Sequence, residues 1–322
     1  IKKILYDWSA SKKTFRSINR VRFEHPDFPI FVDMSIVKMN KRIAYKNGKF
    51  GPSNPSDTIQ ESDVFHSTPI YEIELEIDNE RITKRVPSVE ILKNQLKQCI
   101  RYILSGLQET PYPISYSEQE SIIKSYMCRL FGESWKTTEI PKPYFLGPQS
   151  VSLQQEHIVE TNHVSITQNY TVTEKADGLR SLLYISGTGK VYLITNNLKV
   201  LFTGSMTKEK HCWDSLLDGE FIMYGKSPEK KRLFLYAAFD IYYFGGMQKN
   251  AHVRGLPFST NDETVLEDKC RYTLLKKFMG MCVLESVTPT ASCEFRMRNK
   301  HFEQTTDEQT IFNACALIWS KQ

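Results

Sequence analysis

The strongest constraint on the fold lies between residues 170 and 202, where β-branched and aromatic residues recur in short runs separated by turn residues. Three such runs are residues 179–186, 191–195 and 198–202, and the turn Gly187-Thr188-Gly189 joins the first two. Each run is too short for a typical helix and has the length of a strand. The sequence therefore predicts an antiparallel sheet in this half of the chain.

A set of reactive groups stands just before these strands, in the segment Thr173-Glu174-Lys175-Ala176-Asp177-Gly178-Leu179-Arg180. The segment offers an amine, carboxylates, a glycine that lets the backbone approach a ligand, and a guanidinium. Lys-x-Asp-Gly occurs by chance in roughly one chain in ten of this length, and Asp-Gly is also a common hairpin dipeptide. A plain surface turn is therefore the alternative, and the choice depends on the residues further along the chain.

Two later stretches bear on that choice. The first, residues 216–222, places Asp218-Gly219-Glu220 between apolar residues, and the second, residues 233–243, is an apolar strand that contains Phe239. Taken alone, Glu220 is also compatible with an exposed hairpin position and Phe239 with a core position.

An acidic strand is predicted near the beginning of the chain, at residues 71–78. Strand periodicity puts Glu72, Glu74 and Glu76 on one face, where their charges repel each other. A solvated edge strand is one interpretation. The other is a face on which a divalent metal, or basic groups from upstream strands, relieves the repulsion. The candidate basic groups are Arg16, Arg20, Arg22 and Lys38.

Two helices are predicted between these regions. Ser88 is positioned to cap the first, and Ser117 with Glu120 forms a capping box for the second. Prolines follow the second helix, and a length of 322 residues favours two domains. We therefore predict a domain boundary between residues 135 and 140.

Composition sets broad limits. The 42 basic and 37 acidic residues give a net charge of +5, which is compatible with a polyanionic substrate but is not specific for one. Seven scattered cysteines without a Cys-x-x-Cys pair indicate reduced thiols, a cytoplasmic type of compartment and no zinc site. No apolar run is long enough to span a bilayer, so no membrane partner is expected. Because the first residue is Ile1, we expect the chain to be a piece of a longer protein.

The stretches around Lys175, Glu220 and Phe239 resemble, in the same order, the motifs of covalent nucleotidyltransferases, which include mRNA capping guanylyltransferases and polynucleotide ligases. The resemblance implies that Lys175 attacks the α-phosphate of a nucleoside triphosphate with the help of Mg²⁺ or Mn²⁺. It also implies that Glu220 binds ribose or metal and that Phe239 stacks on the purine. The nucleotide-binding set by resemblance is Glu174, Asp177, Gly178, Arg180, Glu220 and Phe239.

An attacking lysine must be uncharged, although its reference pKa is about 10.4. Cationic neighbours lower that value, and Arg180 is the neighbour that the sequence offers for Lys175. We therefore expect Arg180 and bound metal to lower the pKa of the Lys175 amine.

The acidic strand resembles the tunnel-type RNA triphosphatases. That resemblance implies metal binding by Glu72, Glu74 and Glu76, and triphosphate binding by Arg16, Arg20, Arg22 and Lys38. A triphosphatase produces the 5′-diphosphate RNA end that a guanylyltransferase uses. The combination is similar to the multifunctional capping enzymes of large DNA viruses. It implies GTP and 5′-triphosphate or 5′-diphosphate RNA as partners, a methyltransferase domain or subunit as a further partner, and the host cytoplasm or the virion as location.

The expected fold is therefore α+β. Residues 1–135 are expected to form part of a triphosphatase-like antiparallel β-barrel, and residues 140–322 an antiparallel-sheet guanylyltransferase domain. We find no counterpart of the family's C-terminal motifs or its OB-fold in the sequence. Two alternatives stay open, namely an ATP-dependent polynucleotide ligase that forms a lysyl-AMP intermediate and a non-catalytic scaffold of a capping complex.

Overall fold

The computed structural model describes residues 8, 11–40, 42–44, 50–85, 88–132, 144–159, 165–167, 170–225, 231–250, 252–259, 269–288, 294–305 and 309–321. Contacts between residues divide the chain into two units, Ile1–Tyr102 and Ile103–Gln322. The predicted boundary between residues 135 and 140 lies outside the described residues. The division of contacts falls earlier, within helix α4 (Val89–Gln108).

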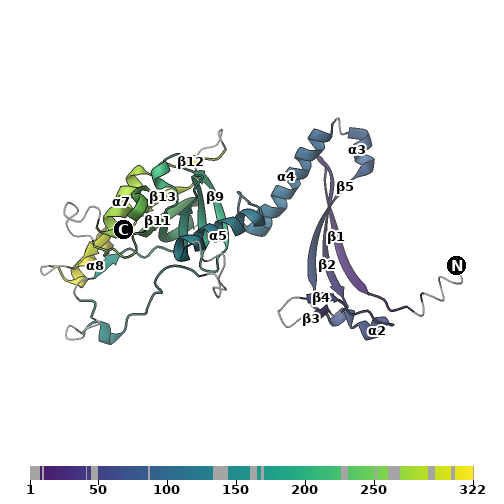
Figure 1. Ribbon diagram of the computed structural model, residues 1–322, viewed down its shortest axis with the longest axis horizontal. Coiled ribbons are helices and arrows are strands. Elements are labelled where there is room, and N and C mark those ends of the chain that lie inside the picture. Colours follow the sequence, from purple (N-terminus) through teal and green to yellow (C-terminus); the bar gives the residue numbers. More distant parts are fainter. Residues whose placement is uncertain are drawn as a thin grey trace. The chain divides into compact units, whose positions relative to one another are not determined.

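The first unit is built on an open three-stranded antiparallel sheet in the order β1-β2-β5 (Figure 1). The strands are β1 (Arg16–His25), β2 (Phe28–Met39) and β5 (Ile70–Ile77). A small hairpin pairs β3 (Arg42–Ala44) with β4 (Phe50–Ser53). Short helices are α2 (Ile59–Ser62), η1 (Val64–His66) and α3 (Asn79–Arg85). The antiparallel strands agree with the predicted class, whereas closure into a triphosphatase-like barrel stays a prediction.

Helix α4 (Val89–Gln108) begins where the sequence predicts, because the hydroxyl of Ser88 accepts a hydrogen bond from the Ile91 amide at 3.3 Å. Helix α5 (Tyr116–Phe131) is capped by Ser115 rather than by the predicted Ser117. The Ser115 hydroxyl accepts from the Glu118 amide at 3.1 Å. The cap therefore lies two residues earlier, directly after the chain leaves the buried Ile114.

The second unit contains a seven-stranded sheet in the order β12-β9-β8-β7-β10-β11-β13. Neighbouring strands are antiparallel, except that β13 runs parallel to β11. The strands are β7 (Leu179–Ile185), β8 (Lys190–Thr195), β9 (Val200–Met206), β10 (Leu216–Tyr224), β11 (Arg232–Tyr243), β12 (Glu285–Ser286) and β13 (Arg296–Asn299). The predicted hairpin of residues 179–195 is therefore confirmed.

A second, two-stranded sheet pairs β6 (Thr171–Thr173) with β14 (Phe302–Gln304). The remaining elements are η3 (Gln155–His157), η4 (Lys210–Cys212), η5 (Gly245–Asn250), α7 (Arg271–Met281) and α8 (Ile311–Ser320). Within the described ranges, no helix is both long and apolar enough to cross a membrane.

Both faces of the large sheet carry a hydrophobic core. Leu274 and Phe278 of α7 pack into the core on one face, and Tyr126 and Met127 of α5 pack into the core on the other. The Tyr126 hydroxyl also donates to the Tyr144 carbonyl at 2.7 Å and accepts from the backbone amide two residues further on. Helix α5 therefore holds the segment that begins at residue 144 against the sheet.

Candidate active site

The segment around Lys175 bridges the two sheets of the second unit. Strand β6 ends at Thr173, whose hydroxyl donates to the His301 carbonyl at 2.7 Å, and β7 begins at Leu179. The amide of Gly178 donates to the Glu220 carboxylate at 2.8 Å. A Cβ at Gly178 would lie 2.5 Å from the carbonyl oxygen of Phe221, so only glycine allows this close approach to β10. The turn therefore brings Glu220 beside the lysine motif.

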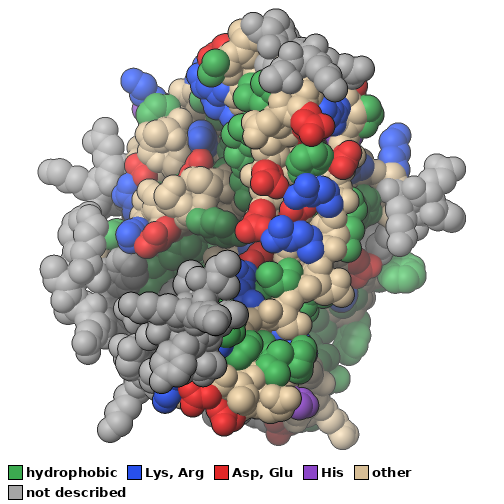
Figure 2. Space-filling model, turned by 90° about the vertical axis from the view of Figure 1, so that its right-hand side faces the viewer, with side chains coloured by type: hydrophobic (Ala, Val, Ile, Leu, Met, Phe, Trp, Pro, Cys, Tyr) green, Lys and Arg blue, Asp and Glu red, His purple; other side chains and the backbone are tan. Residues whose placement is uncertain are grey.

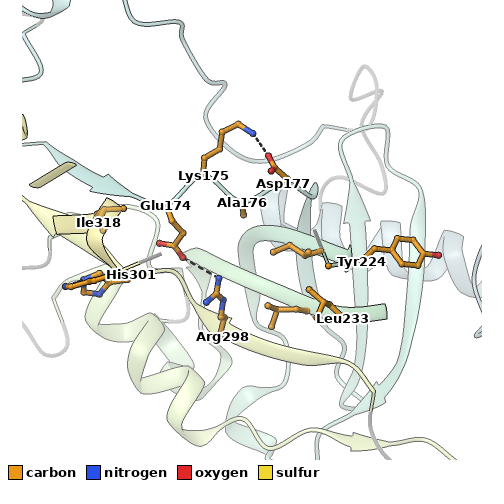
Figure 3. A pocket seen from close by; sticks show the side chains of 13 residues that line it. Glu174, Lys175, Ala176, Asp177, Tyr224, Leu233, Arg298, His301 and Ile318 are labelled. Carbon is orange, nitrogen blue, oxygen red and sulfur yellow. Dashed lines mark hydrogen bonds and ion pairs between the residues drawn. The ribbon is translucent and has the colours of Figure 1, made fainter. Parts of the chain in front are cut away.

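Lys175 projects from this turn with 87% of its side chain exposed. Its ammonium lies 2.7 Å from the Asp177 carboxylate, and Figure 3 shows it turned toward Asp177 and away from Glu174. The hydrogen bond and charge of Asp177, together with the charge of Glu220, raise the pKa of Lys175. The unliganded site therefore holds the amine in its protonated, non-nucleophilic form.

The expectation that Arg180 lowers the pKa of Lys175 is wrong in this structure. The Arg180 guanidinium forms a two-point ion pair with Asp218, at 3.2 and 2.7 Å, and donates to the Pro148 carbonyl at 2.6 Å. Its charge is therefore balanced by a neighbour on β10. The ion pair between Arg180 and Asp218 could not be predicted from the sequence, because it depends on how β7 and β10 pair. In that register Glu220 lies opposite Arg180, and Asp218 lies two residues before Glu220 on the same strand.

Asp218 is the buried centre of this arrangement. Its side chain is fully buried, and the Tyr242 hydroxyl donates to it at 2.7 Å. Burial raises the pKa of Asp218, although the guanidinium opposes that effect. Gly147 closes over the pair with φ at +140°, and a Cβ there would collide with Arg180. Arg180 is thus held on several sides before any ligand binds.

Phe239 is half-buried on β11 and lies near two cations. The Arg180 guanidinium lies 5.8 Å from the ring centroid, and the Lys300 ammonium also lies 5.8 Å from it. A partly exposed aromatic ring can accept a flat base by stacking.

Lys300 was not identified from the sequence. It is only 6% exposed, its backbone amide donates to the Ala238 carbonyl at 2.7 Å, and burial lowers its pKa. Glu174, Glu220 and Lys175 all lie near enough to influence that pKa. Within the described part of the chain, its ammonium has no hydrogen bond or ion pair. The alternation of Arg296, Arg298 and Lys300 was a signal that could have revealed it.

A pocket of about 520 Å³ opens beside Lys175 (Figure 3). Its floor is apolar and includes Ile222, Leu233 and Leu235, whereas Arg298 and His301 are polar groups on its wall. Arg298 lies 3.6 Å from the Glu174 carboxylate. In the β10–β11 register, Glu220 pairs with Ala237 and Ile222 with Leu235, so Glu220 and the floor share one face of the sheet. Glu220 and Phe239 themselves do not line the pocket.

Six of the seven charged residues predicted in the first unit gather on one sheet face, and Lys38 is the exception. Each glutamate is paired with an arginine of β1. The pairs are Arg16–Glu72 at 2.9 Å, Arg20–Glu74 at 2.6 Å and Arg22–Glu76 at 2.9 Å. Figure 2, viewed from the side of this unit, shows basic and acidic side chains interleaved on the exposed surface. We call this set the arginine–carboxylate ladder.

Asp33 of β2, which was not among the predicted site residues, lies under the arginine–carboxylate ladder. It is 2% exposed and accepts two hydrogen bonds from Arg22, each of 2.7 Å, and one from Arg20. Hydrogen bonds from Arg22 are the main cause that lowers the pKa of Asp33. Lys38 is not part of the ladder. Alternation along β2 places it on the opposite face, where its ammonium donates to the Phe65 carbonyl at 2.6 Å.

The ladder does not, by itself, resemble a metal site. Among the residues that the structure describes, no group of three or more His, Cys, Asp or Glu side chains could hold a metal ion. The repulsion between Glu72, Glu74 and Glu76 is relieved by arginines, which was one of the two possibilities that the sequence left open. Metal binding by these glutamates stays a prediction.

Comparison with known proteins bears on the second unit. A family model described as the mRNA capping enzyme catalytic domain matches residues 114–316, which is more than half of the chain and includes Lys175, Glu220 and Phe239. The chain belongs to the mRNA capping enzyme family.

Two relatives agree with this family. The "Probable mRNA-capping enzyme" of Acanthamoeba polyphaga mimivirus is 28% identical over 152 residues, which cover 47% of this chain and 11% of the relative. The "mRNA-capping enzyme subunit alpha" of Yarrowia lipolytica is 28% identical over 218 residues, which cover 56% of this chain and 52% of the relative. The matches therefore span about half or less of either relative. The family predicted from the lysine motif is confirmed.

Proposed function

We propose that this capping enzyme chain transfers GMP from GTP to the 5′-diphosphate end of RNA through a covalent lysyl-GMP intermediate on Lys175. The observation that carries the proposal is the placement of Lys175 beside Glu220, on the sheet face that includes the pocket floor. Arg180 and Lys300 flank Phe239 close by. This arrangement supplies a nucleophile, a ribose or phosphate partner and a stacking ring within one region of the second unit.

Formation of the intermediate requires Lys175 to leave Asp177 and to release one proton to water before the attack and a second one once the P–N bond has formed. The free Nζ electron pair then attacks the α-phosphorus of GTP. The bond to the β-phosphate oxygen breaks, and pyrophosphate leaves with that electron pair. Binding of the nucleotide is the event that we expect to separate Lys175 from Asp177, because the pair lies at the surface, where an ion pair contributes little to stability.

Lys300 supports a preference for guanine over adenine. Lys300 carries only donors, and its ammonium lies beside the ring on which the base is proposed to stack. Guanine presents acceptors at O6 and N7, whereas adenine presents an amino group at the position of O6. Within the described residues the Lys300 ammonium has no hydrogen bond or ion pair, so we expect guanine to satisfy its donors better than adenine does.

A divalent cation, Mg²⁺ or Mn²⁺, is part of the proposal. Within the described residues, no group of three or more His, Cys, Asp or Glu side chains could hold such an ion, and we expect it to enter with the phosphates of GTP. When bound, the ion neutralises phosphate charge and assists departure of pyrophosphate.

A second proposed function concerns the first unit. Three arginines on one face of β1 have the chemistry to hold the 5′-triphosphate of RNA. We propose that the arginine–carboxylate ladder contributes to RNA 5′-triphosphatase activity in the whole protein. A methyltransferase domain or subunit is a further proposed partner of that whole protein.

The nucleotide is tested by incubating the full chain with GTP or ATP labelled at the α-phosphate and then running a denaturing gel. We expect label from GTP to stay on the protein and Lys175→Ala to abolish it. Lys208→Ala is the matched control, because Lys208 is also exposed and ion-paired, at 2.6 Å to Glu285. Labelling by ATP alone would identify a ligase, and no labelling by either nucleotide would identify a scaffold.

A further inference from the structure

We propose that the pocket beside Lys175 binds the 5′ end of the acceptor RNA, with its diphosphate near Arg298 and His301 and its first nucleoside against Tyr224. The inference rests on the proposed guanylyltransferase function and extends it to the second substrate. Phe239 and Lys300 belong to the donor nucleotide, and neither of them lines this pocket. Donor and acceptor nucleosides thus have separate surfaces in the second unit.

The chemistry of the two steps requires a shared phosphate position. In the first step, Lys175 attacks the α-phosphorus opposite the departing pyrophosphate. In the second step, an oxygen of the RNA β-phosphate attacks the same phosphorus in line with the P–N bond. The new P–O bond forms as the P–N bond breaks, and the electron pair returns to Nζ, which takes a proton from water. The RNA diphosphate therefore enters where pyrophosphate left.

The pocket offers basic side chains at such a position. Figure 3 shows Arg298 and His301 across the pocket from the Lys175 side chain. Arg298 is half-exposed, and its nearest carboxylate oxygen, on Glu174, is 3.6 Å away, which is too long for a strong hydrogen bond. Its guanidinium can therefore turn to phosphate at little cost.

His301 and Lys321 form the next part of the wall. Both side chains contact Glu303, at 2.7 and 2.6 Å, and the two nitrogens lie 3.0 Å apart. Lys321 and His301 lower the pKa of Glu303 through these contacts. One carboxylate thus holds two basic groups at the pocket rim, where an RNA phosphate can bind them from the open side.

The rest of the pocket suits a nucleoside. A volume of about 520 Å³ is in the range of small-molecule sites. The floor formed by Ile222, Leu233 and Leu235 is apolar, and Tyr224 at the end of β10 is 52% exposed. An exposed aromatic ring beside an apolar floor is a surface on which any base can stack, as a guanylyltransferase with varied RNA ends requires.

The test separates the two half-reactions of the full chain. Lysyl-GMP formation is measured with labelled GTP, and transfer is measured with a 5′-diphosphate oligoribonucleotide. For Tyr224→Ala we expect the KM for RNA to rise about tenfold. The efficiency of GMP transfer to RNA should therefore fall, while the rate of lysyl-GMP formation stays unchanged. Tyr224→Phe is expected to restore transfer. Tyr116→Ala, on α5, is the control, because Tyr116 is also exposed and does not line the pocket.

Arg298→Gln is expected to raise both the KM for RNA and the KM for pyrophosphate in the reverse reaction. For Arg298→Lys we expect a smaller rise in both KM values. The inference is overturned if Tyr224→Ala leaves the KM for RNA unchanged or slows lysyl-GMP formation equally. It is also overturned if Arg298→Gln affects neither KM. Absence of lysyl-GMP in the unmodified chain is a different result, because it removes the proposed function together with this inference.

Discussion

At the scale of single residues, Lys175 and Asp177 form an ion pair that must break before Lys175 can act as a nucleophile. Asp177 raises the pKa of Lys175, so the amine is protonated below that raised value and becomes nucleophilic only above it. Removing the carboxylate should lower the pKa. For Asp177→Asn we therefore expect the acidic limb of the pH profile of lysyl-GMP formation to move to lower pH, even if the maximal rate falls. A limb that stays in place would show that Asp177 does not control the amine.

Breaking the ion pair between Asp218 and Arg180 is expected to lower the free energy of unfolding by a large amount. Asp218→Ala would leave a partly buried guanidinium without its carboxylate, and breaking such a pair costs about 3–5 kcal/mol. Tyr242→Phe removes one hydrogen bond to Asp218 and should cost about 1 kcal/mol. Urea unfolding of both variants measures the difference, and equal losses would contradict the central role of the ion pair.

The position of Lys300 leads to a prediction about the selectivity for GTP over ATP. Lys300→Met keeps the length and apolar stem of the side chain but removes its donors. We expect the preference for GTP over ATP in lysyl-nucleotide formation to fall about tenfold, within the ~1–3 kcal/mol that a specific base contact provides. Phe239→Leu is the comparison, because loss of stacking should weaken the binding of GTP and of ATP to the same extent. An unchanged GTP-to-ATP ratio in Lys300→Met would exclude Lys300 from base recognition.

At the scale of elements, the arginine–carboxylate ladder on β1, β2 and β5 makes a prediction about its own glutamates. Alanine at Glu72, Glu74 and Glu76 would release Arg16, Arg20 and Arg22, while Asp33 still orients the last two. We expect the affinity of the full chain for tripolyphosphate, measured by calorimetry, to rise. A fall in affinity that depends on added Mg²⁺ would show instead that the glutamates hold a metal between the protein and the phosphate.

Sequence periodicity predicted the strands and turns of the active site better than the contacts between its side chains. The hairpin of residues 179–195 follows from local patterns of β-branched and turn residues. The partner of Arg180 does not, because it depends on pairing between β7 and β10. Lys300 was missed for the same reason, since its burial depends on β13 lying along β11.

The same limit applies to the first unit. Alternation along the acidic strand placed Glu72, Glu74 and Glu76 together, and the structure agrees. Alternation along β2 also separates Lys38 from Ser35, which shares a face with the glutamates. Periodicity thus contained that information, but the resemblance grouped Lys38 by charge rather than by face.

At the scale of the whole molecule, α5 belongs with the nucleotidyl-transfer unit. The sequence placed the boundary after this helix because prolines come next, whereas Ile122, Tyr126 and Met127 are buried in the core of the large sheet. The family match, which begins at residue 114, agrees with that grouping. An expressed second unit should therefore start before α5, near residue 103.

The central claim is a covalent bond between Lys175 and GMP. Its most direct test is peptide mass spectrometry of the full chain after incubation with GTP, ATP and a divalent cation. The prediction is a peptide that carries GMP on Lys175, with the adduct lost when pyrophosphate is added. An adduct on another residue, AMP in place of GMP, or no adduct on folded protein would contradict it.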